Sequence, residues 1–243
     1  MDDAPRRGPR AAPVRELGAR LGELGRTDAA LTVLLVLVFC MLLLVPPLMS
    51  AGVISATVLD VLFSSIIAAA AAAASTHRRA AYVATALALG TLAVRWFHFG
   101  LREPSLGIVD AALGAVALLV FAGYVLRQVL RSGRITLHRV RGAVAAFLLF
   151  GLAWAAAYEL VWRMDSGAFR LAASRDPRLE LTYYSFVTLT TVGYGDITPL
   201  IPAARSLAIA EALIGQLYPA ILIARLVSME IAARASAPTD RVN

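Results

Sequence analysis

Residues 191–196 read TVGYGD, a segment whose backbone, more than its side chains, could do chemistry. Successive carbonyl groups can face one axis only if alternate residues adopt left-handed backbone angles, which Gly193 and Gly195 reach without steric cost. Rings of backbone carbonyl oxygens can replace the water around a dehydrated cation. Val192 and Tyr194 are expected to point backward into protein and to brace the segment. The segment is therefore a candidate cation-binding site.

The residues just before this segment must hold it in place. Residues 181–191 are apolar and rich in hydroxyl groups, but they number about half of the ~20 that a helix needs to cross the hydrocarbon core. They can therefore only enter the membrane and turn back. Such a re-entrant segment is tolerated where protein or a water-filled cavity surrounds it, because lipid cannot satisfy its free backbone groups. A short segment of this kind predicts a pore.

TVGYGD is the selectivity-filter signature of potassium channels, and residues 183–190, YYSFVTLT, resemble the pore helix of that family. The resemblance implies a potassium ion bound by backbone carbonyls, with no cofactor besides this permeant ion. One chain supplies one filter strand and the ring requires four, so the resemblance also implies a homotetramer. By this resemblance the filter consists of Thr191, Val192, Gly193, Tyr194 and Gly195, and the carbonyls of the first four bind the ion. Asp196 lies at the filter mouth. The pore-helix residues that support the filter are Tyr183, Tyr184, Thr188 and Thr190.

The chain departs from some family members at one position of the pore helix. Those members place a glutamate three residues after Tyr184, where it supports the filter aspartate, whereas this chain has Val187. Asp196 is therefore expected to find other partners or to stay hydrated at the mouth, where four copies would attract cations.

The composition places these elements in a membrane. Hydrophobic residues make up 59% of the chain and charged residues 16%, whereas soluble chains average about 45 to 50% and about 25%. These values exclude a soluble enzyme, a secreted disulfide scaffold and a disordered tail. Cutting the chain at charges and turn residues predicts an all-α integral membrane protein with six transmembrane helices, and with the re-entrant pore helix and filter loop between helices five and six. The predicted spans are residues 29–49, 53–74, 80–97, 108–126, 144–162 and about 203–233.

The basic residues orient the chain. All 23 are arginines, and with 16 acidic residues they give a net charge of +7. If the N-terminus is cytoplasmic, sixteen arginines lie inside, which favours two cytoplasmic termini in a plasma (inner) membrane and an extracellular filter. Their spread between apolar stretches argues against a nucleic-acid partner, and those after the fourth span fit anionic lipid of the inner leaflet. The arginines left outside are Arg95, Arg102, Arg163, Arg170, Arg175, Arg178 and Arg205.

The spans divide the chain into four parts. Residues 1–28 form a cytoplasmic segment, residues 29–139 a four-helix membrane domain, residues 140–233 the pore domain and residues 234–243 a short cytoplasmic tail. The first segment is either an interfacial helix or a loosely ordered basic tail. The pattern that favours the helix is the recurrence of Val14, Leu17, Leu21 and Leu24 at intervals of three to four.

The sixth span carries two residues that could bend it. Gly215 stands where the inner helix of potassium channels commonly carries a hinge glycine, and Pro219 follows one turn later. Proline removes a backbone donor and crowds the preceding turn, so we expect the helix to bend or break here. The bend could serve as a gate or be a static kink that shapes the cavity, and the sequence leaves both open.

The fourth span bears on voltage dependence. It contains no basic residue before Arg127, whereas a voltage sensor needs several arginines inside the membrane because each charge gains only about 2.3 kcal/mol per 100 mV. We therefore expect a passive potassium-selective channel without strong voltage dependence. The alternatives are a non-selective cation channel or a regulatory channel subunit. An ion-coupled transporter is disfavoured because transporters usually carry two interrupted spans in symmetry-related halves.

Several charged residues lie in or near the predicted spans, where ionisable groups are functional candidates by default. Asp60, Arg95 and Asp110 are expected to pair in structural polar contacts. Glu159 and Glu211 could line the outer vestibule or brace neighbouring helices, and Arg225 is expected at the inner mouth.

Overall fold

The computed structural model describes residues 12–235 of the chain apart from 76–77, 102, 132–135 and 172–175, and for residues 12–27, 104 and 233–235 it describes the backbone alone. The predicted stripe of Val14, Leu17, Leu21 and Leu24 and nearly all of the predicted tail lie outside the described side chains. The described part contains eight helices and two short strands: α1 (Ala12–Leu43), α2 (Val45–Ser50), α3 (Ala56–Ala74), α4 (Arg78–Leu101), α5 (Pro104–Val129), α6 (Leu137–Met164), β1 (Phe169–Arg170), α7 (Pro177–Leu189), β2 (Thr198–Pro199) and α8 (Pro202–Ala235).

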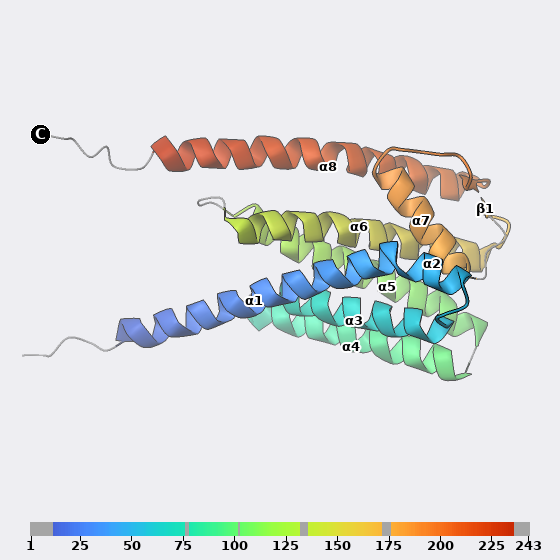
Figure 1. Ribbon diagram of the computed structural model, residues 1–243, viewed down its shortest axis with the longest axis horizontal. Helices are drawn as coiled ribbons and strands as arrows, with labels where there is room; N and C mark the ends of the chain where they lie inside the picture. Colours follow the sequence, from blue (N-terminus) through green and yellow to red (C-terminus); the bar gives the residue numbers. More distant parts are fainter. Residues whose placement is uncertain (1–11, 76–77, 102, 132–135, 172–175, 236–243) are drawn as a thin grey trace, which may run out of the picture.

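The long helices run along the length of the molecule (Figure 1). α5 packs against both α4 and α6, and α3 packs against α1, α4 and α5. The short helix α7 contacts α6 on one side and α8 on the other, and it lies at the same end of the molecule as the strands. α8 runs along the outside of the bundle, so α7 fills the space between it and the other helices at that end.

Five helices of the described part are long and apolar enough to cross a membrane, namely Ala56–Ala74, Arg78–Leu101, Ser105–Val129, Leu137–Met164 and Pro202–Ala232. They correspond to the second to sixth predicted spans. The all-α, multi-pass architecture predicted from the sequence is thus confirmed. α7, with 13 residues, is too short to span, as the re-entrant prediction requires.

The first predicted span is divided into two helices. The apolar part of α1, Asp28–Leu43, is shorter than the other spans, and α2 follows after Leu44. Pro46 and Pro47 stand in the first turn of α2, where proline is tolerated because the amide groups of a first turn lack helical partners anyway. The same prolines cannot continue α1, because each lacks the N–H that the preceding turn would accept. Gly52, with φ of +74°, then turns the chain toward α3.

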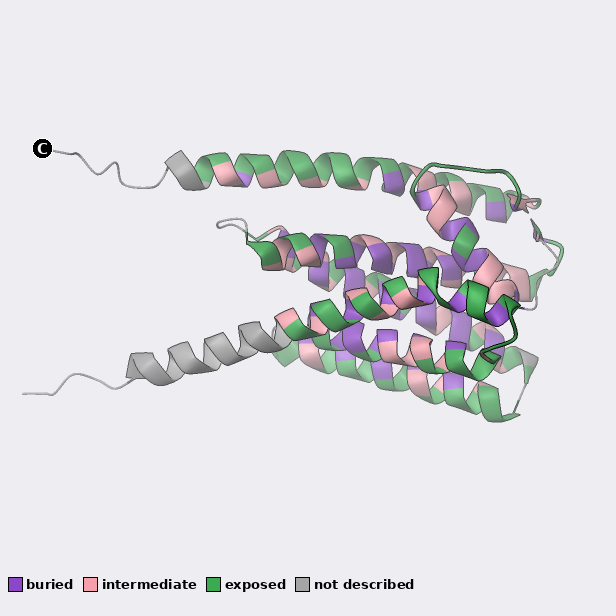
Figure 2. Ribbon diagram, viewed as in Figure 1, coloured by how far each residue is buried: buried purple, intermediate pink, exposed green. Residues whose placement is uncertain are grey.

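Burial separates the inner helices from the outer ones (Figure 2). In the window that could cross a membrane, 56% of the α6 residues are buried but only 11% of the α8 residues. Apolar side chains such as Ile209, Leu213, Leu217 and Ile221 are more than half exposed along α8. α8 therefore presents most of its apolar surface away from its own chain.

Candidate ion-binding site

Alternate residues of the filter segment, residues 191–196, have left-handed backbone angles. The angle φ is +59° at Thr191, +56° at Gly193 and +81° at Gly195. The two glycines were expected to adopt this conformation, but Thr191 was not. A β-branched residue rarely has a positive φ, and such strain persists only where the surrounding structure imposes it, often at a functional site.

Hydrogen bonds to the last turn of α7 impose this geometry. The amide of Thr191 donates to the carbonyl of Thr188 over 2.9 Å, and the amides of Val192 and Gly193 both donate to the carbonyl of Val187, over 3.0 and 3.3 Å. The Thr190 hydroxyl donates to the Phe186 carbonyl over 2.6 Å. The first half of the filter is therefore held by its own pore helix.

The predicted support residues lie on different sides of α7. Tyr184 is buried, and its side chain is hydrogen-bonded to that of Thr188. Tyr183 is 41% exposed and is hydrogen-bonded through its side chain to Asp196, which raises the pKa of the Tyr183 phenol. Asp196 also accepts the amide of Ile197 over 3.1 Å. Asp196 thus has partners in its own chain although position 187 carries valine.

Val192 and Tyr194 do not brace the filter within a single chain. Their side chains are 52% and 72% exposed in the single chain, so the expectation that they point into protein stays a prediction. The physical reason for the exposure is that none of the described elements covers these two side chains. A packing surface for them would have to come from outside the described part of the chain.

A small sheet that the sequence did not predict anchors the segment that follows residue 196. β1 and β2 pair antiparallel, with Phe169 opposite Pro199 and Arg170 opposite Thr198. The amide of Leu200 donates to the carbonyl of Ala168 over 2.8 Å. The strands are two residues long, too short for a periodic pattern to indicate them.

Aromatic side chains pack behind α7. The ring of Tyr158 on α6 lies edge-on to those of Phe169 and Tyr184, with centroids 5.5 and 5.0 Å away, and the last two are 5.6 Å apart. Aromatic pairs in this geometry contribute about 0.5 to 1.5 kcal/mol beyond their buried area. The cluster joins the outer helix, the small sheet and the pore helix into one core beside the filter.

At Gly215 the backbones of α7 and α8 approach each other closely. A β-carbon at Gly215 would lie 1.9 Å from the carbonyl oxygen of Leu189, the last residue of α7. Pro219 lies inside α8, which continues as one helix from Pro202 to Ala235 and is not broken. The structure thus assigns Gly215 a packing role that the sequence did not predict, while its hinge role stays a prediction.

Ion pairs tie the pore domain to the helices around it. Arg178, at the start of α7, lies 2.5 Å from Asp60 on α3 and 2.8 Å from Asp176. Burial acts to lower the pKa of Arg178, but the hydrogen bond and charge of Asp176 and the charge of Asp60 outweigh it, so the pKa is raised. The pairing of Asp60 with Arg178 was not foreseen, because the two residues are 118 positions apart.

Two further ion pairs lie in or next to the predicted spans, while Glu211, among the described residues, forms hydrogen bonds only. Arg95 and Asp110 join α4 to α5 over 3.2 Å, as expected, and the guanidinium of Arg95 lies 5.0 Å from the ring centre of Phe63 on α3. Glu159 pairs with Arg163 one turn further along α6, over 2.6 Å. Glu211 is fully buried and forms hydrogen bonds with α6 and α7, so it braces helices and does not line a vestibule. Arg225 is exposed on α8.

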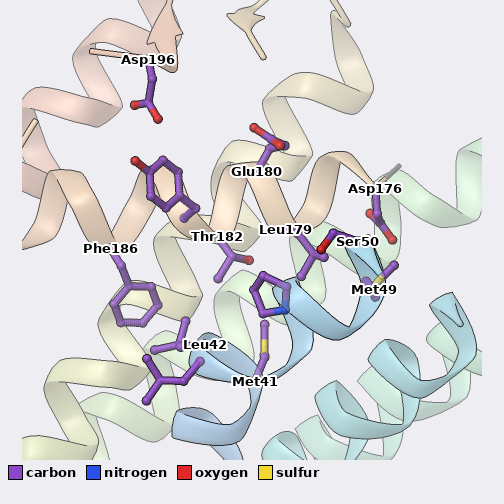
Figure 3. A pocket seen from close by; sticks show the side chains of 13 residues that line it. Met41, Leu42, Met49, Ser50, Asp176, Leu179, Glu180, Thr182, Phe186 and Asp196 are labelled. Atoms are coloured by element: carbon purple, nitrogen blue, oxygen red, sulfur yellow. The ribbon is translucent and has the colours of Figure 1, made fainter. Parts of the chain in front are cut away.

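A cavity lies between α7 and the segment formed by the end of α1 and α2. It has a volume of about 880 Å³. Figure 3 shows apolar side chains of Met41, Leu42 and Phe186 toward its floor, with the carboxylates of Glu180 and Asp196 above them. The pore helix is therefore packed tightly against α6 and α8 but loosely against α1 and α2.

Two membrane-spanning helices, with a re-entrant helix and an alternating left-handed segment between them, define the pore unit of a cation channel. A family model described as an ion channel matches residues 145–231, which include α7, residues 191–196 and most of α6 and α8.

Known proteins resemble the chain over part of its length. The chain is 37% identical to protein LctB of Bacillus caldotenax over 130 residues, which are 50% of this chain and 92% of that protein. It is 40% identical to two pore potassium channel c of Oryza sativa subsp. japonica over 81 residues, 33% of this chain and 18% of that channel. No solved structure matches the chain. The chain belongs to the ion channel family, with a pore domain of the potassium-channel type, and it is a multi-pass membrane protein.

Proposed function

We propose that the protein is the subunit of a homotetrameric channel that conducts potassium passively and selectively. The observation that carries the proposal is the filter segment, in which residues of alternate left-handed conformation follow a re-entrant helix. This backbone alternation lets consecutive carbonyls face one axis, and the ring of oxygens that replaces the water shell of potassium needs four such strands.

The exposure of the filter side chains supports the tetramer. Val192 and Tyr194 are exposed on a single chain, as are many apolar side chains of α8. A ring of four copies would cover both sets with neighbouring subunits, whereas a monomer would leave both sets exposed. The remaining apolar surface of the outer helices would face lipid.

The arrangement of charges supports weak voltage dependence and the predicted orientation. In α5, the helix that corresponds to the fourth span, Arg127 in the last turn is the one basic residue. We propose that the channel lies in the plasma (inner) membrane with both termini in the cytoplasm, and that the arginines beyond α5 contact anionic lipid.

Reconstitution into potassium-loaded liposomes tests the function. We expect rapid efflux down the potassium gradient, block by barium and no comparable flux when sodium replaces potassium. Equal sodium and potassium permeability would instead favour a non-selective cation channel, and no flux at all would favour a regulatory subunit. Chemical cross-linking in liposomes should give a tetramer as the largest product, and a dimer as the largest product would contradict the proposed stoichiometry.

A further inference from the structure

The side chain of Glu211 lies where three helices of the pore domain meet. It belongs to α8 and is completely buried. The hydroxyl of Tyr158 on α6 donates to its Oε2 over 2.5 Å. Its Oε1 lies 2.6 Å from the hydroxyl oxygen of Ser185 on α7, and that oxygen also lies 2.7 Å from the carbonyl oxygen of Gly151 on α6. One carboxyl group therefore connects α6, α7 and α8.

Counting protons indicates which form of Glu211 fits these contacts. A serine hydroxyl has one proton, and a backbone carbonyl can only accept. If the Ser185 proton goes to Gly151, the contact with Glu211 needs a proton on Oε1. A neutral Glu211 then donates to Ser185, Ser185 donates to Gly151, and Tyr158 donates to Oε2. The three short oxygen–oxygen contacts are all hydrogen bonds at the same time only in this protonated form.

The surroundings of Glu211 disfavour a negative charge. The titratable groups that face it are Tyr158 from α6 and Tyr184 from α7. Among the ion pairs of the described residues, none includes Glu211. A buried carboxylate without a cationic partner is costly, and such a group usually takes up a proton.

Glu211 is also connected to the filter. Ser185 precedes Val187 by two residues, and the Val187 carbonyl accepts the amides of Val192 and Gly193. One turn further along α8, Gly215 lies against the end of α7 at Leu189. A change in the contact between Glu211 and Ser185 therefore acts on the helix that holds the filter.

We propose that Glu211 is a positioning residue of the filter that works in its protonated form, so that loss of its proton to solvent at alkaline pH lowers potassium conduction. After ionisation the single proton of Ser185 turns to the carboxylate, and the hydrogen bond to Gly151 that joins α7 to α6 is lost. This inference rests on the proposed potassium conduction and adds that the conduction depends on pH.

The decisive variant is Glu211→Gln, which cannot ionise but keeps an N–H donor for Ser185 and an acceptor for Tyr158. We expect wild-type efflux to fall above a midpoint by up to about tenfold per pH unit, because the protonated fraction of one acid falls in this way. Glu211→Gln should conduct at neutral pH and show no such fall up to about pH 10. Glu103→Gln, which removes an exposed carboxyl between α4 and α5, should behave as the wild type.

Infrared spectroscopy tests the protonation without any need for flux. At neutral pH the wild type should show a protonated-carboxyl C=O band that Glu211→Gln lacks and Glu103→Gln keeps. Absence of this band, or the same alkaline fall in Glu211→Gln as in the wild type, overturns the inference while leaving potassium conduction intact. If the wild type conducts no potassium at any pH, the proposed function fails and the positioning role fails with it, although the band would still report a neutral Glu211.

Discussion

The contact between Gly215 and the end of α7 makes the substitution Gly215→Ala a strict test of the structure. The added β-carbon would lie 1.9 Å from the carbonyl oxygen of Leu189, 2.8 Å from its carbonyl carbon and 3.1 Å from its α-carbon. These are backbone atoms at the C-terminal end of the pore helix, so no side-chain rotation can make room. One of the two helices must move.

The size of the movement follows from the distances. Reaching 3.0 Å, below which real β-carbons essentially never approach another atom, needs a displacement of about 1.1 Å between two backbones that are packed against each other. Overpacking of this kind destabilises proteins by about 1 to 3 kcal/mol, and we expect the upper end because backbone is involved. The same displacement would lengthen the 2.6 Å contact between Glu211 and Ser185 beyond the hydrogen-bond range of about 3.2 Å.

Thermal or denaturant unfolding in detergent, together with the ratio of sodium to potassium flux in liposomes, measures both effects. We expect Gly215→Ala to lower the free energy of unfolding and the potassium selectivity together. Gly90→Ala in α4 and Gly123→Ala in α5 are matched controls, because nothing lies within 4 Å of a β-carbon at either position. Both should be neutral or stabilising by up to about 1 kcal/mol.

Two outcomes would refute the close-contact reasoning. A Gly215→Ala protein with the stability and selectivity of the wild type would show that α7 and α8 are not in contact here. A protein with unchanged stability but altered open probability, and a similar phenotype for Pro219→Ala, would favour the hinge that the sequence predicted.

Three further predictions concern the filter and its anchors. Gly193→Ala meets no steric obstacle, but its φ of +56° costs an L-residue about 1 to 2 kcal/mol, so relative sodium permeability should rise; unchanged permeability would contradict the filter assignment. Arg178→Gln removes the guanidinium that pairs with both Asp60 and Asp176 and should destabilise the protein by about 3 kcal/mol. Asp60→Asn should lower the free energy of unfolding by less, because Arg178 still pairs with Asp176. A larger loss of stability in Asp60→Asn than in Arg178→Gln would disprove the shared pairing. The hydrogen bond to Asp196 raises the pKa of Tyr183. The stabilisation of the fold by this hydrogen bond should therefore be complete below about pH 10 and disappear as the pH rises through the raised pKa. The absorbance titration of the wild type minus that of Tyr183→Phe should show the raised midpoint, and Asp196→Ala should lower it.

The spans and the pore helix could be predicted because each depends on a local property. Long apolar stretches bounded by arginines indicate helices that cross a membrane, and the structure has helices at the second to sixth positions. The division of the first span at Leu44 was also readable in principle, since Pro46 and Pro47 follow directly. Hydropathy alone does not indicate this division, because two prolines hardly change the mean hydropathy of the stretch.

The partners of the buried polar residues could not be predicted. Asp60 and Arg178 are separated by 118 positions, and Glu211 lies 53 positions from Tyr158 and 26 from Ser185. A sequence shows that a charge within a span needs a partner, but several candidates lie within reach of any residue until the helices are packed. The helical pattern around Glu211 gave no indication that three helices meet at its carboxyl group.

The sequence by itself predicted the positive φ of Gly193 and Gly195, because a residue without a β-carbon adopts it freely, whereas the positive φ of Thr191 depends on hydrogen bonds to α7. It also determined the membrane-spanning architecture, since the length of an apolar stretch decides whether it can cross. Only the tertiary structure decided that Gly215 is a point of contact with Leu189 and that Glu211 is enclosed by Tyr158 and Ser185. These are relations between helices, and they exist only once close packing has fixed which faces meet.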